Sequence, residues 1–173
     1  MFVRKIVVIL LIMCFPVSLC YAQGNRALIE KMVNSLNAEN AKSVIIPGSN
    51  GVLSIYFEKA NKNNKNVSLM GMELVYNDIR STFQVGSNIA ITQNGRLVFA
   101  QNGDKTYIKA SGGSKESLSL TLSMFEYIYK KDYVIVKYRD ESFKFNEALY
   151  DKQKHTFTVY DNGKYVKTVT LKQ

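Results

Sequence analysis

Two Asn-Gly pairs, Asn94-Gly95 and Asn102-Gly103, constrain the fold more than any other feature of the sequence. Asn-Gly adopts the positive φ angles of a type I′ turn, whose twist matches that of antiparallel strands. The pairs lie eight residues apart and flank a β-favouring run, Arg96 to Gln101. This spacing predicts a three-stranded meander formed by Ile89–Thr92, Leu97–Ala100 and Thr106–Lys109.

Hairpin signals continue through the last third of the chain. Tyr133–Tyr138 is expected to pair with Ser142–Phe145, and Thr156–Tyr160 with Lys164–Leu171 across Asp161-Asn162-Gly163. Earlier strand candidates are Val52–Phe57, Val67–Tyr76 and Thr82–Val85. About ten short strands joined by hairpins predict an antiparallel barrel or sandwich.

Two helices are expected beside this sheet. Asn25 is suited to cap the first, whose apolar residues recur at helical spacing: Leu28, Ile29, Met32, Val33 and Leu36. The segment from Ser117 to Lys131 fits both a strand, through alternating leucines, and a helical face. We favour a helix over Leu120–Lys130 and leave the strand open as the alternative. The expected fold class is therefore α+β and mostly antiparallel β.

Residues 1–22 have the three-part pattern of a cleaved signal peptide. Arg4 and Lys5 precede an apolar run of ten residues, Ile6 to Phe15, and small residues lie near the end of Cys20-Tyr21-Ala22. A run of this length is too short to cross a hydrocarbon core, which needs about 20 residues. We expect cleavage after Ala22, leaving residues 23–173 as a single α+β domain in the periplasm or outside the cell. Lipidation at Cys20 stays open as an alternative, although Leu19 does not fit the usual lipoprotein signal.

Cleavage changes the chemistry that is available. Both cysteines, Cys14 and Cys20, would leave with the signal, and the net charge would fall from +9 to +7, from 21 basic and 14 acidic residues. A chain without thiols has neither disulfides nor a cysteine nucleophile. The single histidine, His155, does not provide a His-rich metal site, and no base network accompanies it. We therefore expect no metal, no cofactor and no nucleophilic catalysis.

Carboxylates are the remaining catalytic candidates. A glycoside-cleaving site needs two of them a few ångströms apart, one of which stays protonated. Candidates in the sequence are Glu58, Glu73, Asp78, Glu126 and Glu141. A carboxylate-based hydrolase is therefore one alternative function.

Binding is the function that the sequence favours. Tyrosines and cations are interleaved in one stretch, and the candidate binding residues are Tyr127, Lys130, Lys131, Tyr133, Lys137 and Arg139. Surfaces with such residues suit protein interfaces and anionic polymers. We expect an exported, non-catalytic protein that binds an acidic protein or an anionic envelope polymer, for example by occluding the site of a toxin or an enzyme. Nucleic acid is not expected as a partner of an exported protein.

A lipid-like carrier built on a β-barrel is the second alternative function. It would require an interior cavity lined by leucine, phenylalanine and tyrosine. The chain after Ala22 contains no other segment that is long and apolar enough to span a membrane. The oligomeric state and the closure of the sheet are left open.

Overall fold

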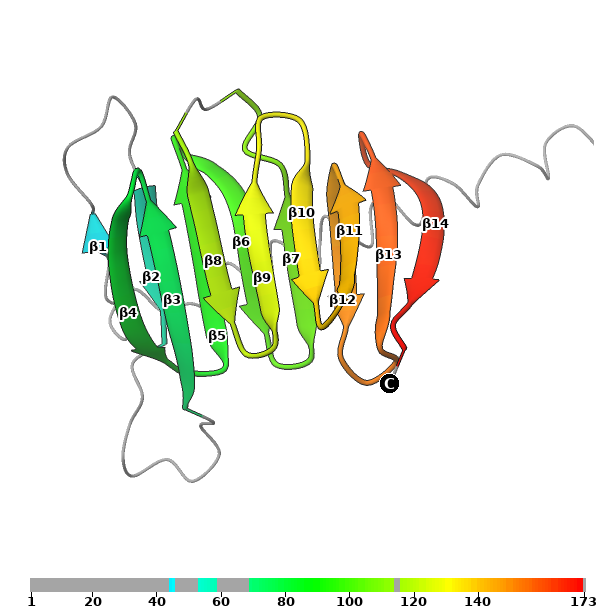
Figure 1. Cartoon of the computed structure of the whole chain (residues 1–173), viewed down its shortest axis with the longest axis horizontal. Coiled ribbons are helices and arrows are strands. Elements are labelled where there is room, and N and C mark those ends of the chain that lie inside the picture. Colours follow the sequence, from blue (N-terminus) through cyan, green and yellow to red (C-terminus); the bar gives the residue numbers. More distant parts are fainter. Residues whose placement is uncertain (1–43, 46–52, 59–68, 114–115, 173) are drawn as a thin grey trace, which may run out of the picture.

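The computed structural model describes residues 44–45, 53–58, 69–113 and 116–172. These residues form fourteen strands in two antiparallel sheets that pack face to face (Figure 1). In spatial order the eight-stranded sheet comprises β1 (Val44–Ile45), β2 (Leu53–Phe57), β5 (Asn88–Gln93), β6 (Arg96–Asn102), β7 (Lys105–Lys109), β12 (Glu147–Asp151), β13 (Thr156–Asp161) and β14 (Lys164–Thr170). The six-stranded sheet comprises β11 (Glu141–Phe145), β10 (Val134–Tyr138), β9 (Phe125–Tyr129), β8 (Leu118–Leu122), β3 (Met70–Tyr76) and β4 (Ile79–Val85).

The predicted α+β class is wrong, because the described residues form strands, turns and bends and no helix. Of the two predicted architectures, the structure has the sandwich, since each sheet keeps two edge strands instead of closing on itself. The expected helix beginning near Asn25 and the expected signal peptide, residues 1–22, lie outside the described residues. No segment of the described residues is a helix that could cross a membrane.

The helix predicted over Leu120–Lys130 is instead the hairpin of β8 and β9. Its leucines at 118, 120 and 122 point into the core, as do the aromatic rings of β9, which alternate with half-buried residues. Burial of every second side chain is the pattern of a strand with one face on a core. The turn is made by Ser123 and Met124, with Ser123 at φ 56°. Ser123-Met124 is not one of the Asn-Gly or Asp-Gly pairs that mark a two-residue hairpin turn, and the leucine and aromatic spacing around it also fits a helix.

The predicted meander is confirmed, since β5, β6 and β7 pair in that order. Asn94 and Gly95 both have positive φ, as a type I′ turn requires. Between β6 and β7 the two turn residues are Gly103 and Asp104, and of these only Gly103 has positive φ, as in a type II′ turn. The two C-terminal hairpins, β10–β11 and β13–β14, are also confirmed.

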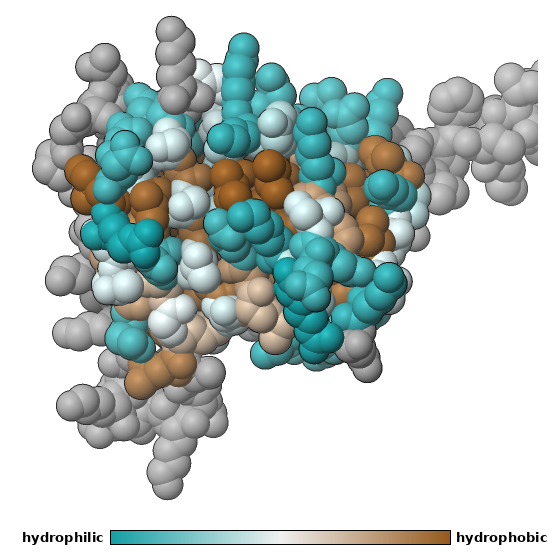
Figure 2. All heavy atoms as spheres, in the orientation of Figure 1, coloured by the Kyte–Doolittle hydropathy of each residue, from teal (hydrophilic) through white to brown (hydrophobic). Residues whose placement is uncertain are grey.

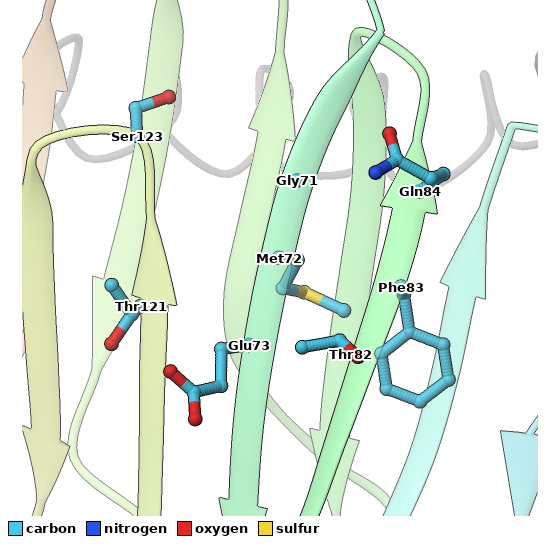
Figure 3. A pocket seen from close by; sticks show the side chains of 8 residues that line it. All are labelled: Gly71, Met72, Glu73, Thr82, Phe83, Gln84, Thr121 and Ser123. Atoms are coloured by element: carbon cyan, nitrogen blue, oxygen red, sulfur yellow. The ribbon is translucent and has the colours of Figure 1, made fainter.

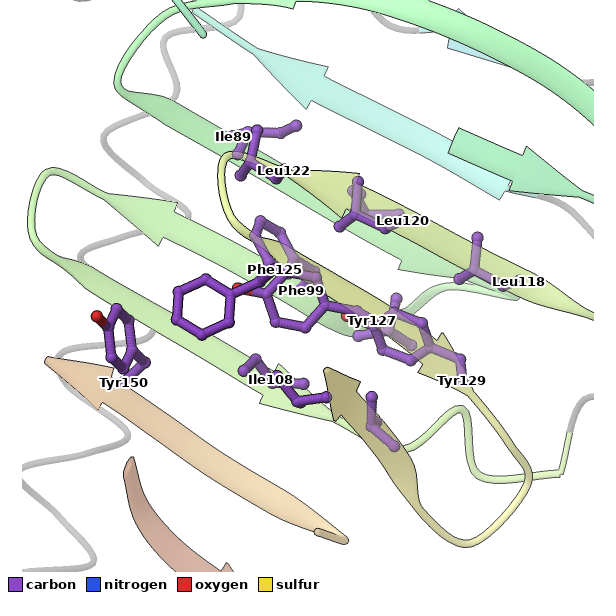
Figure 4. Close-up of a cluster of buried hydrophobic side chains, with 14 of the residues drawn as sticks. Ile89, Phe99, Ile108, Leu118, Leu120, Leu122, Phe125, Tyr127, Tyr129 and Tyr150 are labelled. Carbon is purple, nitrogen blue, oxygen red and sulfur yellow. The ribbon is translucent and has the colours of Figure 1, made fainter. Parts of the chain in front are cut away.

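The core lies between the two sheets and is rich in aromatic rings (Figure 4). Phe99 of β6 meets Tyr127 of β9 edge to face, with ring centroids 5.3 Å apart. Phe157 of β13 contacts four further rings, those of Phe125, Phe143, Phe145 and Tyr150. Each buried aromatic side chain removes a large apolar area from water. This ring cluster joins the two sheets without any disulfide, because neither cysteine belongs to the described residues.

Candidate binding surface on the six-stranded sheet

The candidate binding surface is the side of the six-stranded sheet that faces away from the core, here called the outer face. Residues that alternate with the core residues point to this side, and the strand register aligns them in two neighbouring rows. The apolar row contains Arg80, Val75, Ser119, Ile128, Ile135 and Lys144. The charged row contains Thr82, Glu73, Thr121, Glu126, Lys137 and Ser142.

The apolar row has a hydrophobic centre with a cation at each end. Val75, Ile128 and Ile135 are half-buried on a sheet face that carries no other layer of described residues. Figure 2 shows apolar side chains in brown forming a band across this side of the molecule, with hydrophilic side chains in teal above and below it. At one end Lys144 lies over the ring of Tyr133, with Nζ 3.8 Å from the ring centroid. An apolar strip bordered by polar groups is typical of protein interaction sites.

The charged row takes part in two ion pairs, one of which is made with Arg80 of the apolar row. Arg80 contacts Glu73 at 2.5 Å, and Lys137 contacts Glu126 at 3.0 Å. The two carboxylates flank Thr121, because β8 separates β3 from β9. This arrangement supplies fixed charges of both signs along one row.

A shallow depression of about 320 Å³ lies at one end of the outer face (Figure 3). Its lining includes the side chains of Glu73, Thr82, Gln84, Thr121 and Ser123, together with Gly71. Because Gly71 has no side chain, the lining stays open at this position, and a Cβ placed there would meet no atom within 4 Å. Hydroxyl, amide and carboxylate groups at its rim are suited to hydrogen bonding with a polar partner.

The six residues predicted as binding residues do not form one patch. Tyr127 lies in the core with 2% of its surface exposed, and burial raises the pKa of its hydroxyl far above the usual range. Lys130 and Lys131 lie exposed at the turn after β9, next to half-buried Tyr133. Of the remaining two residues, only Lys137 is in the charged row. Arg139 occupies the turn at the opposite end of β10, with its guanidinium 5.2 Å from the ring centroid of Tyr138.

The tyrosine-rich pattern near residue 130 comes mainly from the core. Tyr127, Tyr129 and Tyr138 are all buried. Burial raises the pKa of the Tyr129 hydroxyl as well, with a smaller contribution from Tyr127. These rings therefore contribute to the packing of the sandwich and are not available to a partner.

The basic character of the sequence is concentrated outside the described residues. The described residues include fourteen lysines and arginines and twelve aspartates and glutamates. The remaining nine basic and two acidic residues fall in the other segments of the chain. The sandwich itself therefore carries little net charge. The cations on the outer face attract only those charged groups that lie close to them, because salt screens longer interactions.

The five candidate catalytic carboxylates are distributed over the sandwich. Only Glu73 and Glu126 share the outer face, and both are in ion pairs. Glu58 accepts a hydrogen bond from Asn88 at 3.0 Å, Glu141 contacts Lys172 at 3.4 Å, and Asp78 lies in the turn after β3. His155 lies in the loop before β13 at φ 51°. Among the described residues no cluster of three or more His, Cys, Asp or Glu could hold a metal ion.

The sequence reasoning missed the isoleucines of the outer face. The runs Tyr127-Ile128-Tyr129 and Val134-Ile135-Val136 are apolar at every position and do not alternate with polar residues. Such continuous runs indicate that both faces of a strand contact something apolar. In a two-layer sandwich one face of each strand lies on the molecular surface. The continuous apolar runs were therefore the signal that could have identified Ile128 and Ile135 as apolar surface residues.

Comparisons with protein-family models, with curated proteins and with solved structures found no significant match for this chain.

Proposed function

We propose that the protein is an exported, non-catalytic binding protein that docks a protein partner on the outer face of its six-stranded sheet. The observation that carries this proposal is the apolar row, in which Val75 on one side of Ser119 and Ile128 and Ile135 on its other side supply apolar side chains between Arg80 and Lys144. Covering this strip with a partner removes apolar surface from water, at about 25 cal/mol per Å².

The charged row gives this surface its selectivity. A partner that covers the apolar row must also accommodate Glu73, Glu126 and Lys137 in the row beside it. Charge patterns of this kind exclude wrong partners more than they add affinity. A folded protein with a matching pattern of charges of both signs fits this row better than a polymer of one sign does, which is why we favour a protein partner.

Catalysis is less well supported by the geometry. Glu73 and Glu126 are each engaged in an ion pair, and they lie on strands separated by β8, with Thr121 between them. The lipid-carrier alternative is also less well supported. Aromatic rings from the two sheets, with centroids 4.9–5.8 Å apart, contact one another in the space where a ligand cavity would have to lie. Export is inferred from the signal-like pattern of residues 1–22.

The experiment uses the immobilised protein and an envelope or extracellular extract of the source organism. In the test variant, Ile128→Thr and Ile135→Thr are combined, which keeps the β-branched shape and removes the apolar contact. The control variant combines Leu69→Thr and Met124→Thr, which removes two exposed apolar side chains outside the two rows. Circular dichroism and urea unfolding verify that both variants are folded.

We expect one or a few proteins to be retained by the unmodified protein and by the control variant, and lost from the test variant. Retention that persists in high salt would agree with a contact dominated by the apolar strip. Equal retention by all three proteins would contradict the proposal. Retention of an anionic polymer that is abolished by salt would replace it with the polymer-binding alternative.

A further inference from the structure

The free edge of β14 is a second surface with the properties of a binding site. β14 is the last strand of the eight-stranded sheet, at the right of the sandwich in Figure 1, and β13 pairs with it on one side. Among residues 44–45, 53–58, 69–113 and 116–172, no strand pairs with its other side. With seven residues it is one of the two longest edge strands in the sandwich. A long open edge is a template for another strand.

The backbone of β14 offers unused hydrogen-bonding groups on this edge. The N–H of Leu171 donates to the carbonyl of His155 at 2.9 Å, so it points toward β13. Backbone groups alternate in direction along an antiparallel strand. Thr168 and Thr170 are therefore expected to direct their N–H and C=O groups to the open edge.

The side chains of β14 are more exposed than those of any other described strand. Tyr165 is 59% exposed and Val166 is 53% exposed, and the lysines at 164 and 167 are exposed as well. The register shift opposite Val159 and Tyr160 makes Val166 an extra residue on β14. The exposed aromatic and apolar side chains of this strand therefore have no role in the core.

The charge of this edge selects the kind of strand that can be added. The segment from 164 to 172 contains Lys164, Lys167 and Lys172 and no acidic residue. Lys172 contacts Glu141 at 3.4 Å, whereas Lys164 and Lys167 form no ion pair within the described part of the chain. A second copy of this strand would bring three more lysines to the same edge, and like charges across a strand pair are destabilising. An acidic strand would instead place carboxylates against these cations.

We infer that β14 accepts an extended acidic segment of another protein, which pairs with the open edge as an additional strand. Main-chain hydrogen bonds to β14 supply affinity in this mode of recognition. Lys164 and Lys167 supply the preference for acidic side chains, and Tyr165 and Val166 supply apolar contact. This inference is independent of the outer face, which belongs to the other sheet.

A defined peptide tests the inference. The probe is a synthetic, fluorescently labelled peptide that alternates valine or threonine with glutamate, and its binding is measured by anisotropy. One matched probe has lysine in place of every glutamate. Another carries N-methyl groups on alternate residues, which removes the N–H donors that strand pairing needs. The test variant combines Lys164→Glu and Lys167→Glu, and the control variant combines Lys130→Glu and Lys131→Glu, which changes the net charge equally at a distant turn.

We expect the acidic peptide to bind the unmodified protein and the control variant with affinities within about twofold of each other. The test variant should bind it at least about tenfold more weakly, and the N-methylated and basic probes should not bind. Equal weakening in both variants would overturn the inference, since it would show an effect of net charge alone. Unchanged binding of the N-methylated probe would also overturn it, as would concentration-dependent self-association of the protein through β14.

Discussion

The phenolic hydroxyl of Tyr107 in β7 donates a hydrogen bond to Glu147 of β12, with 3.0 Å between the two oxygens. Glu147 is 8% exposed, and Lys109 lies 3.7 Å from its other carboxylate oxygen. Burial, followed by the nearby charge of Glu147, raises the pKa of Tyr107 far above its usual range, so the hydroxyl remains a donor at neutral pH. The Glu147 carboxylate therefore adds a hydrogen bond and an ion pair to the pairing of β7 with β12, in which Lys109 lies opposite Glu147, 38 residues later in the sequence.

Tyr107→Phe is expected to destabilise the protein by about 2 kcal/mol, because a buried carboxylate loses a hydrogen-bond donor. Urea unfolding followed by circular dichroism measures the change. The control is Tyr165→Phe, whose hydroxyl is exposed and makes only a 3.4 Å contact with Thr168. That control should change the free energy of unfolding by less than about 0.5 kcal/mol. Equal effects of the two substitutions would contradict the account of Glu147.

A second ion pair, between Lys105 and Asp151, joins the same two strands and gives stability a pH dependence. Burial alone would raise the pKa of the Asp151 carboxyl. Hydrogen bonds from Lys105 and from the backbone N–H groups of Lys154 and Gln153 outweigh burial and lower the pKa. A lowered pKa in the folded state contributes stability that is present above the unfolded value, about 3.9, and is lost as pH falls through the folded value.

Asp151→Asn should therefore lower the free energy of unfolding at pH 7 by about 1–2 kcal/mol. The difference from the unmodified protein should shrink as the pH falls below about 4. Urea unfolding at a series of pH values between neutral and strongly acidic measures this. A difference that stays constant down to the most acidic value would contradict the assignment of the pH dependence to Asp151.

The hairpin turns make a further prediction about glycine. Gly95 has φ +71° in the turn between β5 and β6, a conformation that L side chains rarely adopt. Gly95→Ala is expected to cost about 1 kcal/mol of stability. Gly71→Ala is the matched control, because Gly71 lies within β3 at an ordinary φ and with open space around it.

The control substitution Gly71→Ala should leave stability unchanged or raise it by up to about 1 kcal/mol, since alanine restricts the unfolded chain. Thermal unfolding of the two variants measures both effects. If both alanines lowered the melting temperature equally, the turn would not be the cause of the cost at Gly95.

The turn chemistry determined how much of the fold could be predicted from the sequence. Asn94-Gly95 and Asn162-Gly163 marked their hairpins correctly because both residues of each pair adopt positive φ in the structure. Ser123-Met124 carried no such mark, and the leucine and aromatic spacing around it also matches a helix. The local pattern alone could not decide between a hairpin and a helix. The decision depends on the pairing of β8 with β3, in which Leu120 lies opposite Leu74, a residue 46 positions earlier in the sequence.

The candidate site was harder to predict than the fold. A single sequence shows tyrosines and lysines close together, but it does not show which face of the strand each occupies once two sheets stack. Tyr127 and Lys137 illustrate this, since the first lies in the core and the second lies on the outer face. Ile128 and Ile135 align only through the β9–β10 register, which brings the two side chains opposite each other.

Site-specific photocrosslinking shows whether a protein partner contacts the outer face of the six-stranded sheet. A photoreactive benzoylphenylalanine replaces Thr121, an exposed residue of the charged row between Glu73 and Glu126, in the protein expressed in its source organism. The control position is Gln153, in the loop between β12 and β13. We expect a discrete covalent adduct with one protein after irradiation at Thr121 and none at Gln153. No adduct at Thr121, or the same adducts at both positions, would contradict the claim that the outer face binds a protein partner.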